Sequence, residues 1–379
     1  MSTTTQNIQM VDLRKQYHHI KAEIDDAVLA CIESTQYING SAVKQFQASF
    51  EQYLNIKHVI PCANGTDALQ IAMMALELKA GDEVIVPSFT YVATAEVIAL
   101  LGLTPVMVDS DKNTFNITAE LIKKAITSKT KAIVPVHLFG QSCDMEAIMA
   151  LAAKHNIYVI EDNAQAVGAD YTFSDGSKKK TGTIGHIGCT SFFPAKNLGC
   201  YGDGGAIMTN DDDLAEKLRI VANHGQSRRY YHDVVGVNSR LDSIQAAILD
   251  IKLKHLDEYG AARNMVANYY DNAFKNIKDL QTPARQYNST HVFHQYTLQV
   301  KNGKRAALQA HLQALGIPSM IYYPVPLYKQ GAFKHYQNKD FSLPVTEELC
   351  QSVMSLPIHT EMDEALLSLI TEGVTSFFN

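Results

Sequence analysis

The feature that most constrains the fold is a regular alternation of short apolar, β-branched runs with stretches of helical spacing. The apolar runs occupy residues 57–62, 83–87, 104–108, 131–136, 157–161, 189–193 and 205–209. Helix-type spacing occupies residues 66–79, 91–101, 117–127, 144–155 and 212–223. This alternation predicts an α/β fold with a mostly parallel, seven-stranded sheet covered on both faces. Ligands of such sheets bind beyond the carboxyl ends of the strands.

The remainder of the chain predicts a second, smaller α/β domain. A long helix is expected over residues 239–278, followed by a strand at 294–300, a helix at 303–315, a strand at 318–323 and closing helices. We therefore expect a large domain over residues 1–255 and a small domain over 256–379. The first 20 residues or so are candidates to pack with the small domain.

Charge and cysteine content narrow the function classes. A net charge of -6 argues against a nucleic-acid binder. The six cysteines are irregularly spaced and the 14 histidines show no metal-ligand spacing, so neither disulfides nor a metal site is expected. With no apolar leader and no run of about 18 apolar residues, the chain is expected to be cytoplasmic and not to enter a membrane.

Two polar motifs follow the first two predicted strands. Residues 63–69 (ANGTDAL) place Gly65 and Thr66 at the start of a helix, which suits a phosphate. Asn64 or Thr66 could equally be an ordinary helix cap. Tyr91, after the second strand, is placed to stack on a flat ring, although core packing is the commoner role of an aromatic there.

The motif Glu161-Asp162-Asn163-Ala164-Gln165 ends a predicted buried strand. A carboxylate there is costly to desolvate unless it meets a cation, and a protonated pyridine nitrogen would be one. Asp162 would then bind that nitrogen, and Gln165 could bond a ring substituent. The alternative is a helix-capping aspartate.

A single lysine, Lys196, follows another apolar strand and precedes a glycine-rich turn. Partial burial would lower its pKa, as an imine-forming nucleophile requires. A surface lysine is the alternative interpretation. Ser191 lies five residues earlier and could contact the same phosphate as the turn at Gly65. The glycine-rich turn after Lys196 lacks the GxGxxG spacing of dinucleotide-binding sites, and the chain has no P-loop motif. A site for a dinucleotide or a nucleoside triphosphate is therefore not favoured. Together, these motifs predict a site for pyridoxal 5'-phosphate.

With these residues in hand, the chain resembles the DegT/DnrJ/EryC1/StrS sugar aminotransferases, which have the fold-type I architecture of pyridoxal-phosphate enzymes. The resemblance rests on the stretches ANGTDAL, FTYVATAE, EDNAQA, SFFPAKNLG and GVNSRLD. It implies that Lys196 forms the Schiff base, while Asp162, Gln165 and Tyr91 hold the ring. It also implies a phosphate cradle at Gly65, Thr66 and Ser191, and an Asn238 that reaches the phosphate from the other subunit of a homodimer.

The resemblance further implies amine transfer from L-glutamate to a nucleotide-linked sugar, with a UDP-linked 2-acetamido-3-keto uronate as the expected substrate. Arg240 is the candidate for the sugar carboxylate and Arg229 a weaker one. This sequence has Tyr322-Tyr323-Pro324 where those enzymes have His-Tyr-Pro, so a substrate contact at Tyr322 is in doubt.

Three rival functions remain at this point. The dehydratases of the family have a histidine in place of the lysine, so Lys196 argues against that activity. A non-catalytic member would be expected to lack Lys196 or Asp162, and both are present. The serious competitor is an aminotransferase that acts on a dTDP-3-keto-6-deoxyhexose.

Overall fold

The computed structural model describes residues 8–338 and 340–379. Its centre is a seven-stranded sheet with the strand order β1-β9-β8-β5-β4-β2-β3. The strands are β1 (His58–Cys62), β2 (Glu83–Pro87), β3 (Thr104–Val108), β4 (Thr130–Ile133), β5 (Tyr158–Asp162), β8 (Ile187–Ser191) and β9 (Gly205–Thr209). Only β9 runs against its neighbours, β1 and β8, and the other pairs are parallel. The predicted mostly parallel sheet is therefore confirmed.

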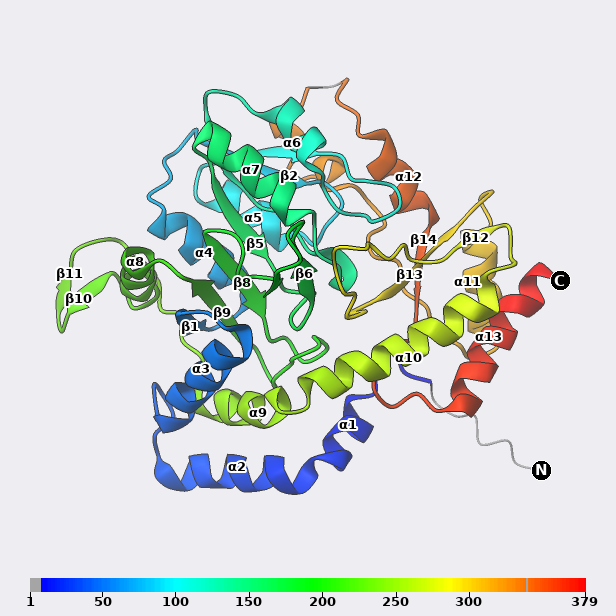
Figure 1. Cartoon of the computed structure of the whole chain (residues 1–379), viewed down its shortest axis with the longest axis horizontal. Coiled ribbons are helices and arrows are strands. Elements are labelled where there is room, and N and C mark those ends of the chain that lie inside the picture. The colour runs from blue at the N-terminus through cyan, green and yellow to red at the C-terminus, as the bar shows by residue number, and fades with distance from the viewer. Residues whose placement is uncertain (1–7, 339) are drawn as a thin grey trace.

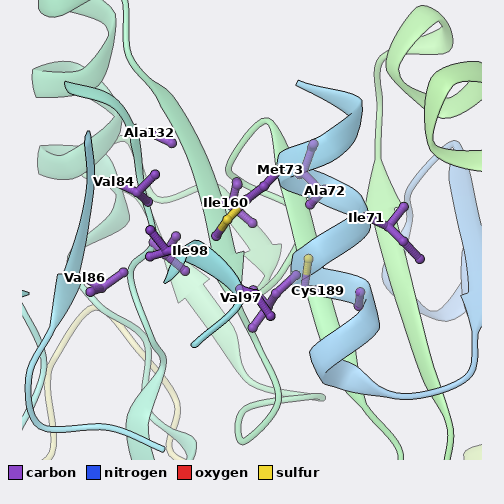
Figure 2. Close-up of a cluster of buried hydrophobic side chains, with 14 of the residues drawn as sticks. Ile71, Ala72, Met73, Val84, Val86, Val97, Ile98, Ala132, Ile160 and Cys189 are labelled. Carbon is purple, nitrogen blue, oxygen red and sulfur yellow. The ribbon is translucent and has the colours of Figure 1, made fainter. Parts of the chain in front are cut away.

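Helices cover both faces of the sheet (Figure 1). One face packs on α4 (Gly65–Ala75), α5 (Ala93–Leu100) and α8 (Asp212–Ala222). The opposite face packs on α3 (Ser41–Leu54), α6 (Ala119–Ala125), α7 (Met145–His155) and α9 (Ser243–Leu253). The two faces follow from strand periodicity, because Val84 and Val86 point to the first face and Ile85 to the second. Figure 2 shows Met73 of α4 packed toward Ile160 of β5 within the first core.

A second hydrophobic cluster lies at the C-terminal end of the chain. It combines α10 (Leu256–Phe274), α11 (Arg305–Ala314) and α13 (Glu364–Phe378) with a three-stranded antiparallel sheet. The strands of that sheet are β12 (Leu280–Gln281), β13 (Tyr296–Val300) and β14 (Val353–Leu356). Ile8 belongs to this cluster, and the Ile358 N–H donates to the Met10 carbonyl at 3.3 Å. The domain boundary at residue 255 stays a prediction, and residues 1–7 of its first domain lie outside the described residues.

The remaining elements are short or peripheral. They are α1 (Leu13–His19), α2 (Lys21–Ser34), α12 (Pro344–Ser352), the hairpins β6–β7 (Asp170–Thr172, Lys178–Lys180) and β10–β11 (Gln226–Arg228, Tyr231–His232), and the 3-10 turns η1 (Leu138–Gly140), η2 (Leu327–Lys329) and η3 (Lys334–Tyr336). The β10–β11 hairpin projects from the body of the protein beside α8 (Figure 1). Across the described residues, no helix is long and apolar enough to cross a membrane.

Two predictions about the second half were wrong. In place of one helix over residues 239–278 there are two, α9 (Ser243–Leu253) and α10 (Leu256–Phe274), separated by Lys254 and His255. The break lets α9 pack on α3 while α10 packs on α13. Residues 318–323 form only an isolated bridge between Met320 and Ser355, because the following tyrosines turn into a cavity. The strand that completes the small sheet is β14, in a stretch where helices were expected.

Candidate active site

A cavity of about 660 Å³ opens at the carboxyl ends of the central strands, where the fold predicts a ligand. Most of the predicted site residues line it, although they come from distant parts of the chain. They are Gly65, Thr66, Tyr91, Asp162, Gln165, Ser191, Lys196, Tyr322 and Tyr323. The cavity therefore brings together every predicted site residue except Arg229, Asn238 and Arg240.

The turn before α4 is both a helix cap and an anion cradle. The Asn64 side chain accepts from the Asp67 N–H at 2.8 Å, so the capping interpretation is correct. The next N–H groups of the helix start have no partner within the helix and lie at the cavity, together with the Thr66 hydroxyl. A Cβ on Gly65 would lie 2.7 Å from Cβ of Ser191, and one on Gly205 would lie 2.5 Å from the Asn64 carbonyl. Glycines at both positions let the three segments close around a small anion.

Asp162 ends β5 with its carboxylate largely buried at the cavity wall. Thr94 Oγ1 donates to Oδ2 at 2.8 Å, and the Ala164 N–H donates to Oδ1 at 3.1 Å. Residues 164–168 form turns and no helix follows Asp162 directly, so the alternative of a helix-capping aspartate does not hold. A carboxylate that is only 6% exposed and bonded by neutral donors alone is suited to a cationic ligand in the cavity.

The hydrogen bonds of Gln165 fix which way its amide points. Its Oε1 accepts from the Phe139 N–H at 2.7 Å, and its Nε2 donates to the Tyr323 hydroxyl at 3.1 Å. The oxygen is therefore engaged by the backbone, and the second N–H of the amide is free to donate toward the cavity. Gln165 would thus offer a donor to an oxygen on a bound ring.

Tyr91 does not belong to the core. Its side chain is 57% exposed although it lines the cavity, and its ring centroid lies 6.4 Å from that of Tyr323. The core-packing alternative is therefore wrong. An uncovered aromatic face at the edge of a cavity is a platform for a flat ligand.

Lys196 lies in the loop after β8, where its N–H donates to the Phe193 carbonyl at 2.8 Å. Burial lowers the pKa of the Lys196 amine to about 8, against the opposing influence of the Asp162 charge. The unprotonated amine is therefore far more available near neutral pH than that of an ordinary lysine, whose pKa is 10.5. The alternative of an ordinary surface lysine does not hold, because the side chain faces the cavity.

Asn238, Arg240 and Arg229 do not line the cavity of the single chain. Arg229 lies in the projecting hairpin region, where its guanidinium lies 5.1 Å from the ring centroid of Tyr230. The neighbouring Ser239 is nonetheless close to the site, since its hydroxyl accepts from the Ala63 N–H at 3.0 Å. The roles predicted for these three residues stay predictions.

Two residues of the site, one behind Asp162 and one in the cavity wall, escaped the sequence analysis. Thr94 is fully buried on α5 and bonds Asp162. His294 lines the cavity, and its Nδ1 has no hydrogen-bond partner among the described residues. Burial and the nearby charges of Lys196 and Arg263 hold the pKa of His294 well below its usual range. Thr94 lies within the FTYVATAE stretch, but nothing in that stretch indicates that its hydroxyl bonds Asp162, and no motif marks His294.

The donor set fits pyridoxal phosphate group by group. The turn at Gly65 and Ser191 suits the phosphate, Asp162 the ring nitrogen and Gln165 the ring hydroxyl, while Lys196 supplies the amine. No cluster of three or more His, Cys, Asp or Glu in the described part of the chain could hold a metal ion. The fold and the cavity therefore define the class of α/β enzymes built around this cofactor.

Within that class, the chain belongs to the DegT/DnrJ/EryC1/StrS aminotransferase family, whose model matches residues 18–375. It is 47% identical to the UDP-2-acetamido-2-deoxy-3-oxo-D-glucuronate aminotransferase of Pseudomonas aeruginosa, across 97% of this chain and 100% of that protein. It is 43% identical to the dTDP-3-amino-3,6-dideoxy-alpha-D-galactopyranose transaminase of Aneurinibacillus thermoaerophilus, across 98% and 99%. The crystal structure of NtdA from Bacillus subtilis with bound cofactor PMP superposes with a TM-score of 0.91 at 27% identity, across 100% of this chain and 87% of that one.

Proposed function

We propose that the protein transfers the amino group of L-glutamate to the C3 ketone of a nucleotide-linked sugar. The proposed substrate is UDP-2-acetamido-2-deoxy-3-oxo-D-glucuronate, and the product is a 3-amino sugar for a cell-surface polysaccharide such as lipopolysaccharide O-antigen. The observation that carries the proposal is a cavity in which Lys196 and Asp162 lie with a phosphate turn. The 47% identity to the Pseudomonas aeruginosa enzyme supports this choice of sugar.

Some residues of the cavity would hold the cofactor, and others would take part in proton transfer. Pyridoxal phosphate, when bound, supplies an aldehyde carbon that carries the amino group and a ring that spreads negative charge. Gly65, Thr66 and Ser191 would hold its phosphate, and Tyr91 would stack on its ring. Each of these contacts fixes the orientation of the ring without taking part in bond changes.

Proton transfer falls to Lys196. Its pKa of about 8 lets the amine exist in both protonation states near neutral pH, so it can take a proton from the substrate carbon and return it. Asp162 would keep a proton on the ring nitrogen through a charge-assisted hydrogen bond. Gln165 would donate to the ring hydroxyl with the amide hydrogen that the protein leaves free.

We propose that two subunits share each active site. Asn238, Arg240 and Arg229 lie outside the cavity of their own chain, and the hairpin that contains Arg229 projects from the body of the protein. Tyr230, Tyr231, Val234 and Val235 in this region are each at least half exposed, and such a concentration of apolar side chains suits a surface that a partner covers. In the dimer, Asn238 would bind the cofactor phosphate of the partner, and Arg240 the sugar carboxylate.

A subunit-mixing experiment tests the sharing of sites. Lys196→Ala and Asn238→Ala proteins, each impaired alone, would form mixed dimers in which one site has both native residues. We expect activity to reappear on mixing, up to about half of the wild-type value per mixed dimer. Activity that stays at the level of the separate variants after proven subunit exchange would contradict shared sites.

The substrate is tested in a coupled assay with the keto-uronate and glutamate, which should yield 2-oxoglutarate and the amino sugar. The alternative substrate, a dTDP-3-keto-6-deoxyhexose, is favoured by the 43% identity to the Aneurinibacillus thermoaerophilus enzyme. A higher kcat/KM for the 6-deoxy sugar would replace our substrate with that one. Loss of the uronate preference in Arg240→Ala would support the carboxylate contact, and an unchanged preference would remove it.

Tyr322 and Tyr323 are proposed to contact the sugar from the far wall of the cavity. The Tyr323 hydroxyl is already bonded to Gln165, whereas Tyr322 makes no hydrogen bond within the described residues that would fix its hydroxyl. The cytoplasm is the proposed compartment, which agrees with six cysteines that are all buried, free thiols.

A further inference from the structure

The carboxylate of Asp162 is held by one donor on each oxygen. Thr94 Oγ1 donates to Oδ2 at 2.8 Å, and the Ala164 N–H donates to Oδ1 at 3.1 Å. Thr94 is 0% exposed and Asp162 is 6% exposed, so water does not compete for either bond. The carboxylate plane is thus fixed by the protein before a ligand enters, and its remaining lone pairs are left for the cavity.

The hydroxyl of Thr94 is not needed for packing. Thr94 is the second residue of α5, and its neighbour Ala93 lines the cavity wall. Valine has the same shape and would fill the same space, while a buried hydroxyl costs free energy unless it is bonded. The bond to Asp162 is the contact that accounts for a hydroxyl at this place. Tyr91 lies three residues before Thr94, just ahead of α5. One short segment therefore carries the side chain that would stack on the cofactor ring and the hydroxyl that bonds the partner of the ring nitrogen.

We propose that Thr94 is a positioning residue of the active site, which acts through Asp162 to keep the proton on the ring nitrogen of the bound cofactor. The inference rests on the proposed function only in assuming that pyridoxal phosphate binds in this cavity. A hydroxyl that donates to a carboxylate stabilises its ionised form and opposes rotation of the group. The proton shared between Asp162 and the ring therefore stays with the nitrogen.

Three variants separate the hydroxyl from the shape of the side chain. Thr94→Val keeps the shape and removes the donor, whereas Thr94→Ser keeps the donor and removes a methyl group. The matched control is Thr181→Val, because Thr181 is also 0% exposed and donates to the Ala166 carbonyl at 2.7 Å, away from the cavity. Thr94→Ala is the second donor-free variant if the valine protein does not fold.

Two measurements report on the cofactor without requiring turnover. The first is the dissociation constant of pyridoxal phosphate from the apo-protein, by absorbance titration. The second is the nitrogen-15 chemical shift of pyridoxal phosphate labelled in the ring, which differs between a protonated and a free ring nitrogen. We expect Thr94→Val to weaken binding about tenfold and to move the shift toward the unprotonated value. Thr94→Ser and Thr181→Val should keep the wild-type shift.

Two results would overturn the proposal. A wild-type nitrogen shift in Thr94→Val and Thr94→Ala would show that the hydroxyl does not hold the proton in place. A change in Thr94→Ser as large as that in Thr94→Val would also overturn it, because the serine variant keeps the hydroxyl donor and the effect could then not come from its loss. Failure of the wild-type protein to bind pyridoxal phosphate at all would refute the proposed function itself, so the two failures are distinguishable.

Discussion

Replacing Glu161 by glutamine should destabilise the protein far more than an ordinary carboxylate-to-amide change. Glu161 is 0% exposed and accepts four hydrogen bonds. One oxygen accepts from the N–H groups of Ile184 and Gly185, both at 2.6 Å. The other accepts from His137 Nε2 at 2.7 Å and from the Gly182 N–H at 2.8 Å.

The tautomer of His137 makes the change costly. Its Nδ1 accepts from the Cys143 N–H at 3.1 Å, so Nε2 carries the proton and donates to Glu161. In Glu161→Gln the new NH₂ group meets two donors, His137 and Gly182. Two hydrogen bonds to a charged group are lost, at about 1.5–3 kcal/mol each, so the expected loss is roughly 3–6 kcal/mol.

Urea unfolding of the apo-protein, followed by far-ultraviolet circular dichroism, measures this loss. The control is Glu77→Gln, which breaks a surface pair with Lys217 (2.6 Å) and should cost no more than about 1 kcal/mol. A loss in Glu161→Gln no larger than that of the control would refute the reasoning.

The same network predicts how stability depends on pH. Burial alone would raise the pKa of Glu161, but the hydrogen bonds from His137 and from Gly185 and Gly182 outweigh it and hold the pKa below its ordinary value of 4.5. A carboxyl whose pKa is lower in the folded state stabilises the fold above the unfolded pKa. This contribution is therefore present above about pH 4.5 and is lost as the pH falls below it. Glu161→Gln should show a weaker acid dependence than wild type.

Three further predictions concern the cofactor site. Gly65→Ala would place a Cβ 2.7 Å from Ser191 Cβ, so we expect pyridoxal phosphate to bind at least about tenfold more weakly. Titration of the apo-protein measures this affinity. A wild-type affinity would show that the turn at Gly65 does not hold the phosphate. Covalent capture of pyridoxal phosphate by Lys196 should speed up as the pH rises through about 8, and Asp162→Asn should lower that midpoint because the Asp162 charge raises the pKa of Lys196. Stopped-flow absorbance gives both midpoints, and an upward shift would contradict the assigned charge effect. Gln165→Glu should weaken cofactor binding about tenfold, since it replaces the free amide donor by an acceptor, and unchanged binding would remove Gln165 from the ring hydroxyl.

The central sheet could be predicted because its strands are short apolar runs between amphipathic helices. The same logic located Asp162 and Lys196, since each follows a strand and ligands bind at that edge. The strand β14 could not be predicted in this way. Its four residues, Val353–Leu356, follow α12 directly, and a short apolar run has no period that separates strand from helix.

Contacts between segments that are distant in the chain could not be predicted from the sequence either. The bond between Thr94 and Asp162 joins residues 68 positions apart, and nothing local to Thr94 indicates it. The orientation of the Gln165 amide depends on the Phe139 N–H, which is placed by the fold and not by the EDNAQA motif. The sequence could therefore name the residues of the cavity but not their hydrogen-bond partners.

The antiparallel strand β9 has a consequence for the order in which the protein matures. The turn that would hold the phosphate follows β1, yet it is packed against Gly205, the first residue of β9, which is synthesised far later. A growing chain cannot complete the cradle until β9 has emerged and joined β1 to the rest of the sheet. Because a ligand stabilises only the state that binds it, cofactor binding would stabilise the pairing of β1 with β9, the first and last strands of the central sheet in chain order. Loading with pyridoxal phosphate would then act as the final step of folding as well as the start of function.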